Sequence, residues 1–159
     1  LVSVVIPTLG RPDLLGRCLA ALVKQDFPAE AFEIIVVDDG PSAETRDLVT
    51  HWVARTIGRQ GGPTIGYTST QRAKGPAAAR NVGWRAAQGR IIAFTDDDTV
   101  PAADWLWQGV QALGSDCAAV WGRVVVPLPP DPTDYERDAA GLADGGFVTA
   151  NCFVRVEAL

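Results

Sequence analysis

The chain has 159 residues and a formal net charge of −5. This length suits one domain with a substantial core, and the acidic balance argues against a nucleic-acid partner, whose phosphate backbone requires a basic face. One histidine and three scattered cysteines leave no histidine-based metal cluster and no cysteine pair at metal-ligand spacing. No apolar run approaches the about 20 residues of a membrane span. We expect a cytoplasmic protein, with membrane association only through segments outside this sequence.

Strand and helix patterns alternate along the first part of the chain. Residues 2–6 are a β-branched apolar run that predicts a buried strand, and apolar residues at helical spacing predict a helix over 11–25. Residues 33–37 predict a second buried strand, and Ser42 is placed to cap the next helix. A short third strand is expected around residues 65–67.

The alternation continues to the end of the chain. Gly75 and Pro76 open an alanine-rich helix that Gly89 is expected to close, and residues 91–94 predict another buried strand. Asp104 is expected to cap a further helix. Two more strands are expected, over 118–126 and 147–156, on either side of a loop rich in Pro, Asp and Gly.

This alternation predicts an α/β fold, in which a mostly parallel sheet has helices on both faces in three α/β/α layers. Residues 1–159 are expected to form a single domain. Ligands of such folds bind beyond the carboxyl ends of the strands. The side chains that immediately follow strands are therefore the first candidates for function, and they are Pro7, Thr8, Asp38, Asp39 and Asp96 to Asp98.

The strongest single feature is the run of three aspartates at residues 96–98. Adjacent carboxylates repel one another, and a hard cation such as Mg²⁺ or Mn²⁺, often shared with substrate phosphates, offsets that repulsion. In extended backbone Asp96 and Asp98 face one side and Asp97 the other. We therefore predict Asp98, with help from Asp96, as the metal contact. A solvated acidic turn is the alternative for such a run in isolation.

Two further segments are candidates for ligand contact. At the second strand end, an aspartate carboxylate can accept hydrogen bonds from a ribose hydroxyl or a base N–H, although Asp-Gly is also common in plain turns. Farther along, Gly75 permits close approach of a ligand to a helix N-terminus, which attracts anions. Arg72, Lys74 and Arg80 add positive charge there, whereas much of the same helix can be explained by packing against the sheet.

Four segments together resemble the family 2 glycosyltransferases of GT-A fold. In chain order they are SVVIPTLGRPDLLGRCLAAL, EIIVVDDGPSAET, KGPAAARNVGWRAAQGRIIAFTDDDTVPAADWL and TANCFVRVEAL. The resemblance covers nearly the whole chain, and the order and spacing of the segments are more specific than any one of them. It implies transfer of a sugar, with inversion, from a nucleotide-diphosphate donor to an acceptor hydroxyl on a sugar, a lipid-linked molecule or another compound. A UDP-sugar is the expected donor and Mg²⁺ or Mn²⁺ the expected cofactor.

The resemblance also implies roles for individual residues. Those expected to bind the donor are Pro7, Thr8, Asp38, Asp39, Arg72, Lys74, Gly75, Arg80, Asp96, Asp97 and Asn151. The metal is expected on Asp98 and Asp96, with the register of the triple in the family's motif open by one residue. The family's catalytic base lies in an acidic motif beyond the segment that ends at Leu159. We therefore name no base, and we expect residues 1–159 alone to bind donor weakly and to turn over poorly.

Three other functions remain open from the sequence. A nucleotidyltransferase also combines a parallel sheet, a nucleotide and metal-bound aspartates, but it usually carries a Gly- and Arg-rich loop after its first strand. A signalling receiver places its acidic pair after the first strand, whereas here the pair follows the second. A transferase-like domain that only binds nucleotide sugars is the third alternative.

Overall fold

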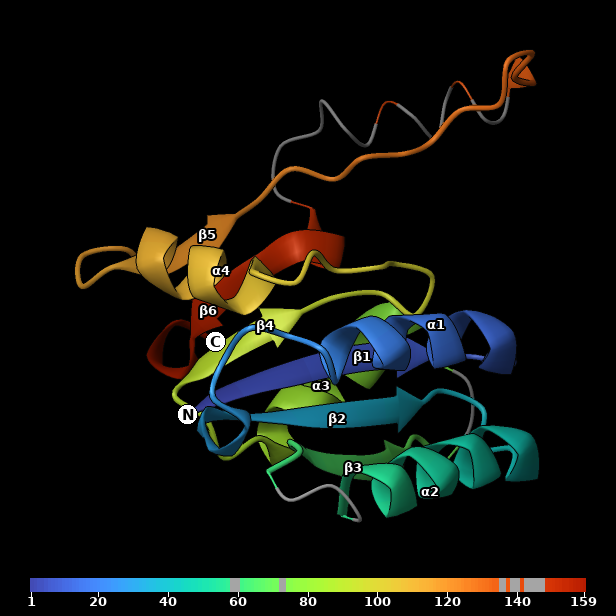
Figure 1. Cartoon of the computed structure of the whole chain (residues 1–159), viewed down its shortest axis with the longest axis horizontal. Coiled ribbons are helices and arrows are strands. Elements are labelled where there is room, and N and C mark those ends of the chain that lie inside the picture. The colour runs from blue at the N-terminus through green and yellow to red at the C-terminus, as the bar shows by residue number, and fades with distance from the viewer. Residues whose placement is uncertain (58–60, 72–73, 135–136, 138–140, 142–147) are drawn as a thin grey trace.

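The structure is a computed structural model of the chain, and it describes residues 1–57, 61–71, 74–134, 137, 141 and 148–159. One six-stranded sheet runs through the molecule in the order β3-β2-β1-β4-β6-β5 (Figure 1). The strands are β1 (Val2–Thr8), β2 (Phe32–Asp38), β3 (Thr64–Ser69), β4 (Ile91–Phe94), β5 (Ala119–Trp121) and β6 (Cys152–Arg155).

The first four strands are parallel to one another, and β6 is antiparallel to both β4 and β5. The expectation of a mostly parallel sheet is thus confirmed. The register pairs Thr8 of β1 with Asp38 of β2, whereas β4 stops at Phe94, opposite Val5. The chain that follows β4 therefore lies beside the last residues of β1, which brings the aspartate run next to Thr8.

Helices cover both faces of the sheet, as expected (Figure 1). They are α1 (Pro12–Leu22), α2 (Ala43–Ile57), α3 (Pro76–Ala86) and α4 (Trp105–Leu113), with short 3-10 turns η1 (Ala29–Ala31), η3 (Thr149–Asn151) and η4 (Val156–Ala158). Alternate β1 side chains point to opposite faces. Val4 packs in the core shared with α1, α2 and α4, whereas Val5 packs with α3. The three-layer arrangement is confirmed.

The capping residues predicted from the sequence are correct for one helix end and wrong for two others. Ser42 Oγ accepts a hydrogen bond from the Thr45 N–H at 3.1 Å, so the predicted cap of α2 is confirmed. The predicted cap of α4 is wrong, because the Asp104 carboxylate makes no capping bond and instead accepts from Gln108 Nε2 at 3.2 Å.

Gly89, which was expected to end α3, does not do so. The helix ends at Ala86, and Gly89 is needed because a Cβ there would lie 2.7 Å from Leu1 O.

The last two strands are shorter than expected. β5 is only Ala119–Trp121, because its partner β6 supplies just three paired residues and the Gly122 N–H already bonds to Asn151 O at 3.0 Å. Of the valines that follow, Val125 is 69% exposed, and Val124 and Val126 are half-buried. A 3-10 turn, η3, precedes β6, so the strand begins at Cys152. The first residue of the expected strand, residue 147, lies outside the described residues.

The three thiols differ sharply in their surroundings. Cys117 is exposed, whereas Cys18 and Cys152 are buried in opposite faces of the sheet. Burial raises the pKa of the Cys18 thiol to about 12 and that of Cys152 to about 11. Because the thiolate is the reactive form, a thiol of pKa about 12 has roughly 10⁻⁴ of its population reactive at pH 8.

We therefore expect a thiol-specific colorimetric reagent to modify Cys117 in the folded chain and the other two cysteines only after denaturation. The measurement is the number of thiols modified at pH 8 with and without urea. Rapid modification of two or three thiols in the folded chain would contradict the packing described for Cys18 and Cys152.

Candidate functional site

A cavity of about 440 Å³ opens at the carboxyl ends of β1 and β2 and beside the start of α3. Its lining residues are Pro7, Thr8, Leu9, Arg11, Asp39, Gly75, Pro76, Arg80 and Asp96. Residues from four separate segments of the chain therefore meet at the edge where a parallel α/β sheet binds its ligands. Most of the residues expected to bind a donor lie here, and Leu9, Arg11 and Pro76 were not among those predicted.

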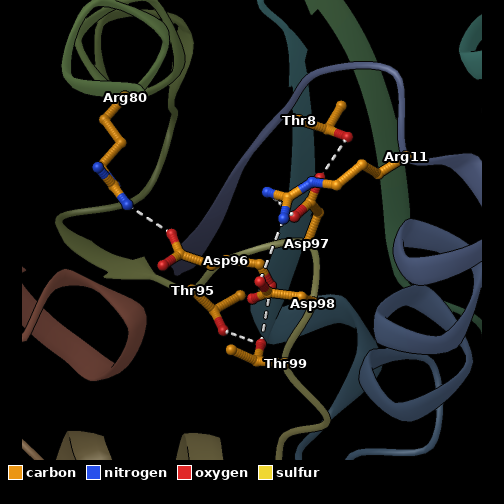
Figure 2. Close-up of polar contacts among 8 residues, drawn as sticks. All are labelled: Thr8, Arg11, Arg80, Thr95, Asp96, Asp97, Asp98 and Thr99. Atoms are coloured by element: carbon orange, nitrogen blue, oxygen red, sulfur yellow. Dashed lines mark hydrogen bonds and ion pairs between the residues drawn. The ribbon is translucent and has the colours of Figure 1, made fainter. Parts of the chain in front are cut away.

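Asp97 is the anchor of the acidic run. Its side chain is fully buried, and Oδ2 accepts a hydrogen bond from Thr8 Oγ1 at 2.7 Å (Figure 2). Arg11 Nη2 lies 2.7 Å from Oδ1 as an ion pair, without the alignment of a hydrogen bond. Burial raises the pKa of this carboxyl group, and the Thr8 hydrogen bond and the Arg11 charge oppose the rise. Asp97 therefore connects the loop after β4 to the end of β1.

Asp96 and Asp98 are more exposed than Asp97, in agreement with the predicted alternation. Their side-chain exposures are 30% and 49%. They have different partners, however: Asp96 Oδ1 pairs with Arg80 Nη2, and Asp98 Oδ2 lies 3.2 Å from Arg11 Nη1 (Figure 2). The backbone turns here, with the Thr99 N–H bonded to Asp96 O at 3.2 Å. The extended geometry assumed for this run thus ends before Asp98.

The donor set of this loop fits a hard divalent cation that a ligand also coordinates. In the described part of the chain, no group of three or more His, Cys, Asp or Glu side chains is arranged to hold a metal by itself. Mg²⁺ needs no such group, because it commonly takes one or two carboxylates and completes its shell with water and substrate phosphates. Asp98 and Asp96 supply such carboxylates at the cavity edge. Their role as metal ligands stays a prediction.

Asp39 joins the second strand to the start of α3. Its carboxylate is buried, accepts from Thr70 Oγ1 at 2.9 Å and from the Gly75 N–H at 2.7 Å, and also bonds the Lys74 N–H at 3.1 Å. Gly75 has φ of 92°, a conformation that favours glycine, and this lets its N–H turn toward Asp39. Asp39 therefore fixes the position of the helix N-terminus that borders the cavity.

Asp38 lies beside Asp39 but is not among the residues that line the cavity. Its carboxylate is fully buried and accepts from the Ser42 N–H at 3.0 Å, the Gly40 N–H at 3.3 Å and Tyr67 Oη at 3.1 Å. Burial, together with the neighbouring Asp38 carboxylate, raises the pKa of the Tyr67 hydroxyl, so it stays a donor at neutral pH. In this structure Asp38 shapes the turn from β2 into α2.

We expect Asp38→Ala to lower the free energy of unfolding by about 2–4 kcal/mol, because it leaves buried donors without their charged acceptor. Tyr67→Phe removes one of these bonds and should cost about 1 kcal/mol. Urea unfolding of the two variants measures both effects. If Asp38→Ala unfolds like the wild type, the turn does not depend on this carboxylate.

The remaining predicted residues lie elsewhere or are not described. Asn151 accepts a hydrogen bond from Trp105 Nε1 at 2.8 Å and donates one to Arg123 O at 2.9 Å, so it ties η3 to α4 and to the chain after β5. Lys74 contributes its backbone N–H to Asp39, as described above. Arg72 lies outside the described residues. Donor contacts of these three residues stay predictions.

Arg80 faces the cavity from α3 and is largely buried, with 15% side-chain exposure. Besides its pair with Asp96, its Nε atom is buried with no hydrogen-bond partner among the described residues. A buried N–H without an acceptor costs free energy. An anionic or hydroxyl-bearing ligand in the cavity would supply that acceptor.

Arg11 is the main functional candidate that sequence reasoning missed. It precedes α1, is half-exposed, and contacts both Asp97 and Asp98. The only indication of this residue in the sequence is that a single arginine lies in the loop after the first strand. Its meaning depends on β1 lying next to β4 in the sheet, which the pattern of residues in one strand does not reveal.

Comparison with known proteins identifies the family. The model of the family described as "Glycosyl transferase family 2" matches residues 3–150. The chain belongs to this family. Its GT-A fold agrees with that of a solved structure: it superposes on the mannosyltransferase PcManGT from Pyrobaculum calidifontis, in complex with GDP-Man and Mn²⁺, with a TM-score of 0.73, 25% identity and 98% of this chain covered. The same comparison covers 44% of the mannosyltransferase chain.

Relatives of known name point to the same family. Glycosyltransferase AglE of Haloferax volcanii is 30% identical over 137 residues, which are 86% of this chain and 43% of the relative. Validoxylamine A glucosyltransferase of Streptomyces hygroscopicus subsp. jinggangensis is 40% identical over 97 residues, or 60% of this chain and 21% of the relative. The chain thus spans less than half the length of these glycosyltransferases. No described helix is both long and apolar enough to span a bilayer.

Proposed function

We propose that the chain binds a nucleotide-diphosphate sugar, with a divalent cation, as the donor of a glycosyl transfer. The observation that carries the proposal is the cavity where Thr8, Asp39, Arg80 and Asp96 meet, directly beside the exposed carboxylate of Asp98. It combines arginine donors for phosphate with carboxylates for a cation. Membership of glycosyl transferase family 2 supports the transfer of a sugar over the nucleotidyltransferase and receiver alternatives.

A UDP-sugar is the donor that we propose, and the relatives support both this choice and its main rival. Staphylococcus aureus TarS has been solved with UDP and with UDP-GlcNAc, whereas PcManGT holds GDP-Man and Mn²⁺. The acceptor would present a hydroxyl group on a sugar or on a lipid-linked molecule. One relative from Campylobacter jejuni is named as a glucosyltransferase acting on an undecaprenol-linked saccharide.

The residues would divide the work as follows. Thr8 and Asp97 hold the loop after β4 against β1, so that Asp98 and Asp96 stay at the cavity edge. A bound Mg²⁺ or Mn²⁺ would offset the charge that builds on the leaving diphosphate. Arg80 would form a hydrogen bond to the nucleotide sugar through its Nε–H, which has no partner among the described residues. The Gly75–Pro76 start of α3, fixed by Asp39, would approach the nucleotide closely. Attack by the acceptor hydroxyl from the opposite side of the sugar would invert the anomeric carbon.

Calorimetric titration of residues 1–159 with UDP, GDP, dTDP and UTP, in Mn²⁺ and in a chelator, tests the proposal. We expect UDP to bind most tightly, and only in the presence of Mn²⁺. Equal binding in the chelator would refute the metal assignment. A clear preference for UTP over every diphosphate would favour the nucleotidyltransferase alternative, and absence of binding by all of them would refute the nucleotide site.

A further inference from the structure

Two arginines engage the acidic run from opposite sides of the cavity (Figure 2). Arg80 reaches Asp96 from α3, and Arg11 divides its guanidinium between two neighbours. Its Nη2 lies 2.7 Å from the buried Oδ1 of Asp97, and its Nη1 lies 3.2 Å from Oδ2 of the half-exposed Asp98. The pair with Asp98 is the longer one, and it is screened by solvent on both sides.

We propose that Arg11 is a latch for the cation site: in the free protein it holds Asp98, and in the loaded protein it holds the diphosphate of the donor. The proposal rests on the function proposed above, because it takes Asp98 as the metal ligand. It adds a residue that the expected donor-binding set did not contain, and it assigns that residue two successive partners.

The charges at the site require such an exchange. A divalent cation on Asp98 would lie close to the Arg11 guanidinium, and the two positive charges would repel each other. Arg11 can yield because its side chain is 49% exposed. Its contact with Asp97 holds it in place, since the buried Asp97 carboxylate would otherwise lose its only positive partner among the described residues. The guanidinium therefore pivots on Asp97 and does not leave the site.

The freed end of Arg11 would then face a phosphate. Arg11, Thr8 and Arg80 line the same cavity, so a ligand held on Asp98 through a cation also lies within this ring of donors. A guanidinium has a planar fork of N–H groups that matches phosphate oxygens in pairs. A diphosphate bound in this cavity would thus have Arg11 on one side and Arg80 on the other.

A latch makes two predictions of opposite sign. Arg11 competes with a cation for Asp98 but cooperates with the cation in binding diphosphate. Removing the guanidinium should therefore tighten the binding of Mn²⁺ alone by about two- to five-fold, the value of an exposed ion pair. The same change should weaken UDP binding at saturating Mn²⁺ by about ten-fold or more, the value of a charge-assisted hydrogen bond. A residue that only supports the fold would weaken both.

The experiment compares Arg11→Gln with Arg17→Gln in residues 1–159. Arg17 is exposed on α1 and makes no ion pair among the described residues, so its variant loses the same charge without breaking a contact to the aspartates. Free Mn²⁺ is measured by electron paramagnetic resonance, and UDP binding by calorimetry at saturating Mn²⁺. Thermal unfolding checks that the variants fold, and Arg11→Lys, which keeps the charge but not the fork, provides a second test if Arg11→Gln is unstable.

We expect tighter Mn²⁺ and weaker UDP binding for Arg11→Gln and no more than a two-fold change in either for Arg17→Gln. We expect Arg11→Lys to show Mn²⁺ binding like the wild type and weakened UDP binding. Weaker or unchanged Mn²⁺ binding in Arg11→Gln overturns the latch, as does UDP binding equal to that of Arg17→Gln. If the wild type binds Mn²⁺ and UDP and Asp98→Asn does not, the proposed function holds. Either of the two contrary outcomes for Arg11→Gln then rejects only the latch. If the wild type binds neither, the proposed function fails first.

Discussion

Asp98→Asn is expected to weaken Mn²⁺-dependent binding of UDP by at least about 100-fold. Loss of a group that merely orients a metal ligand typically costs 10–100-fold in affinity, and loss of the charged ligand itself should cost at least as much. Asp98 is half-exposed and makes one screened ion pair with Arg11, so the free energy of unfolding should change by less than about 0.5 kcal/mol. The variant therefore separates binding from folding.

Asp104→Asn is the matched control for this prediction. Asp104 is an exposed carboxylate just before α4, and its side chain accepts a hydrogen bond from Gln108. The substitution removes the same charge from a nearby segment, so any general electrostatic effect on a phosphorylated ligand should appear in both variants. If the two variants bind UDP and Mn²⁺ equally well, Asp98 is not the metal ligand.

Gly109→Ala is expected to destabilise the chain by about 1–2 kcal/mol. Gly109 lies in α4 where the helix packs on β6, and a Cβ at this position would lie 2.1 Å from the Phe153 ring. Phe153 cannot move away easily, since it is 2% exposed and its ring centroid is 4.9 Å from that of Trp105. Overpacking typically costs about 1–3 kcal/mol, and so short a contact with a buried ring belongs in the upper part of that range. Subtracting the about 1 kcal/mol that alanine gains over glycine in a helix leaves a net cost of about 1–2 kcal/mol.

Gly16→Ala provides the control, since it is the same substitution in a helix with room for it. Gly16 lies inside α1, and the nearest atom to an added Cβ is Leu48 Cδ1 at 3.9 Å, an ordinary contact. This variant should gain up to about 1 kcal/mol from helix propensity. Urea unfolding of both variants measures the difference. Equal stabilities would show that α4 and β6 are not packed as described.

The sheet was predictable because its central strands are continuous apolar runs. A strand that is buried on both faces is apolar at nearly every position, and such a run is easy to recognise in a sequence. Residues 2–6, 33–37 and 91–94 therefore identify β1, β2 and β4 within one or two residues at each end. The end strands depend on their neighbours instead. The valines after Trp121 have the composition of a strand, but β6 is too short to pair with them.

Turn chemistry at helix ends was less predictable. Ser42 and Asp104 are both residues that favour helix caps, yet only Ser42 makes the capping bond. Gly89 follows a helix, as many glycines do, but it serves close packing against Leu1 and Ser3 at the far end of the sheet. The role of Gly89 is decided by neighbours that are distant in sequence, whereas the Asp104 carboxylate is bonded by Gln108 within the same helix. The residue type alone indicates neither outcome.

The position of the candidate site followed from topology, and the contacts within it did not. The end of a buried strand directed attention to the three aspartates, and the structure brings them to the cavity edge. The division of labour among them depends on Thr8 and Arg11, which approach from β1 only because β1 and β4 are neighbours. Asp38 and Asp39 are adjacent in sequence, yet only Asp39 lines the cavity.

The most direct test of the cation and diphosphate site is anomalous diffraction from crystals of the chain grown with UDP and Mn²⁺. Manganese gives its own signal, which locates the cation independently of the nucleotide. The account predicts one peak bonded to an Asp98 carboxylate oxygen and to the diphosphate, with the phosphates between Arg11 and Arg80. A nucleotide bound without such a peak, or a peak away from Asp96 to Asp98, would contradict it.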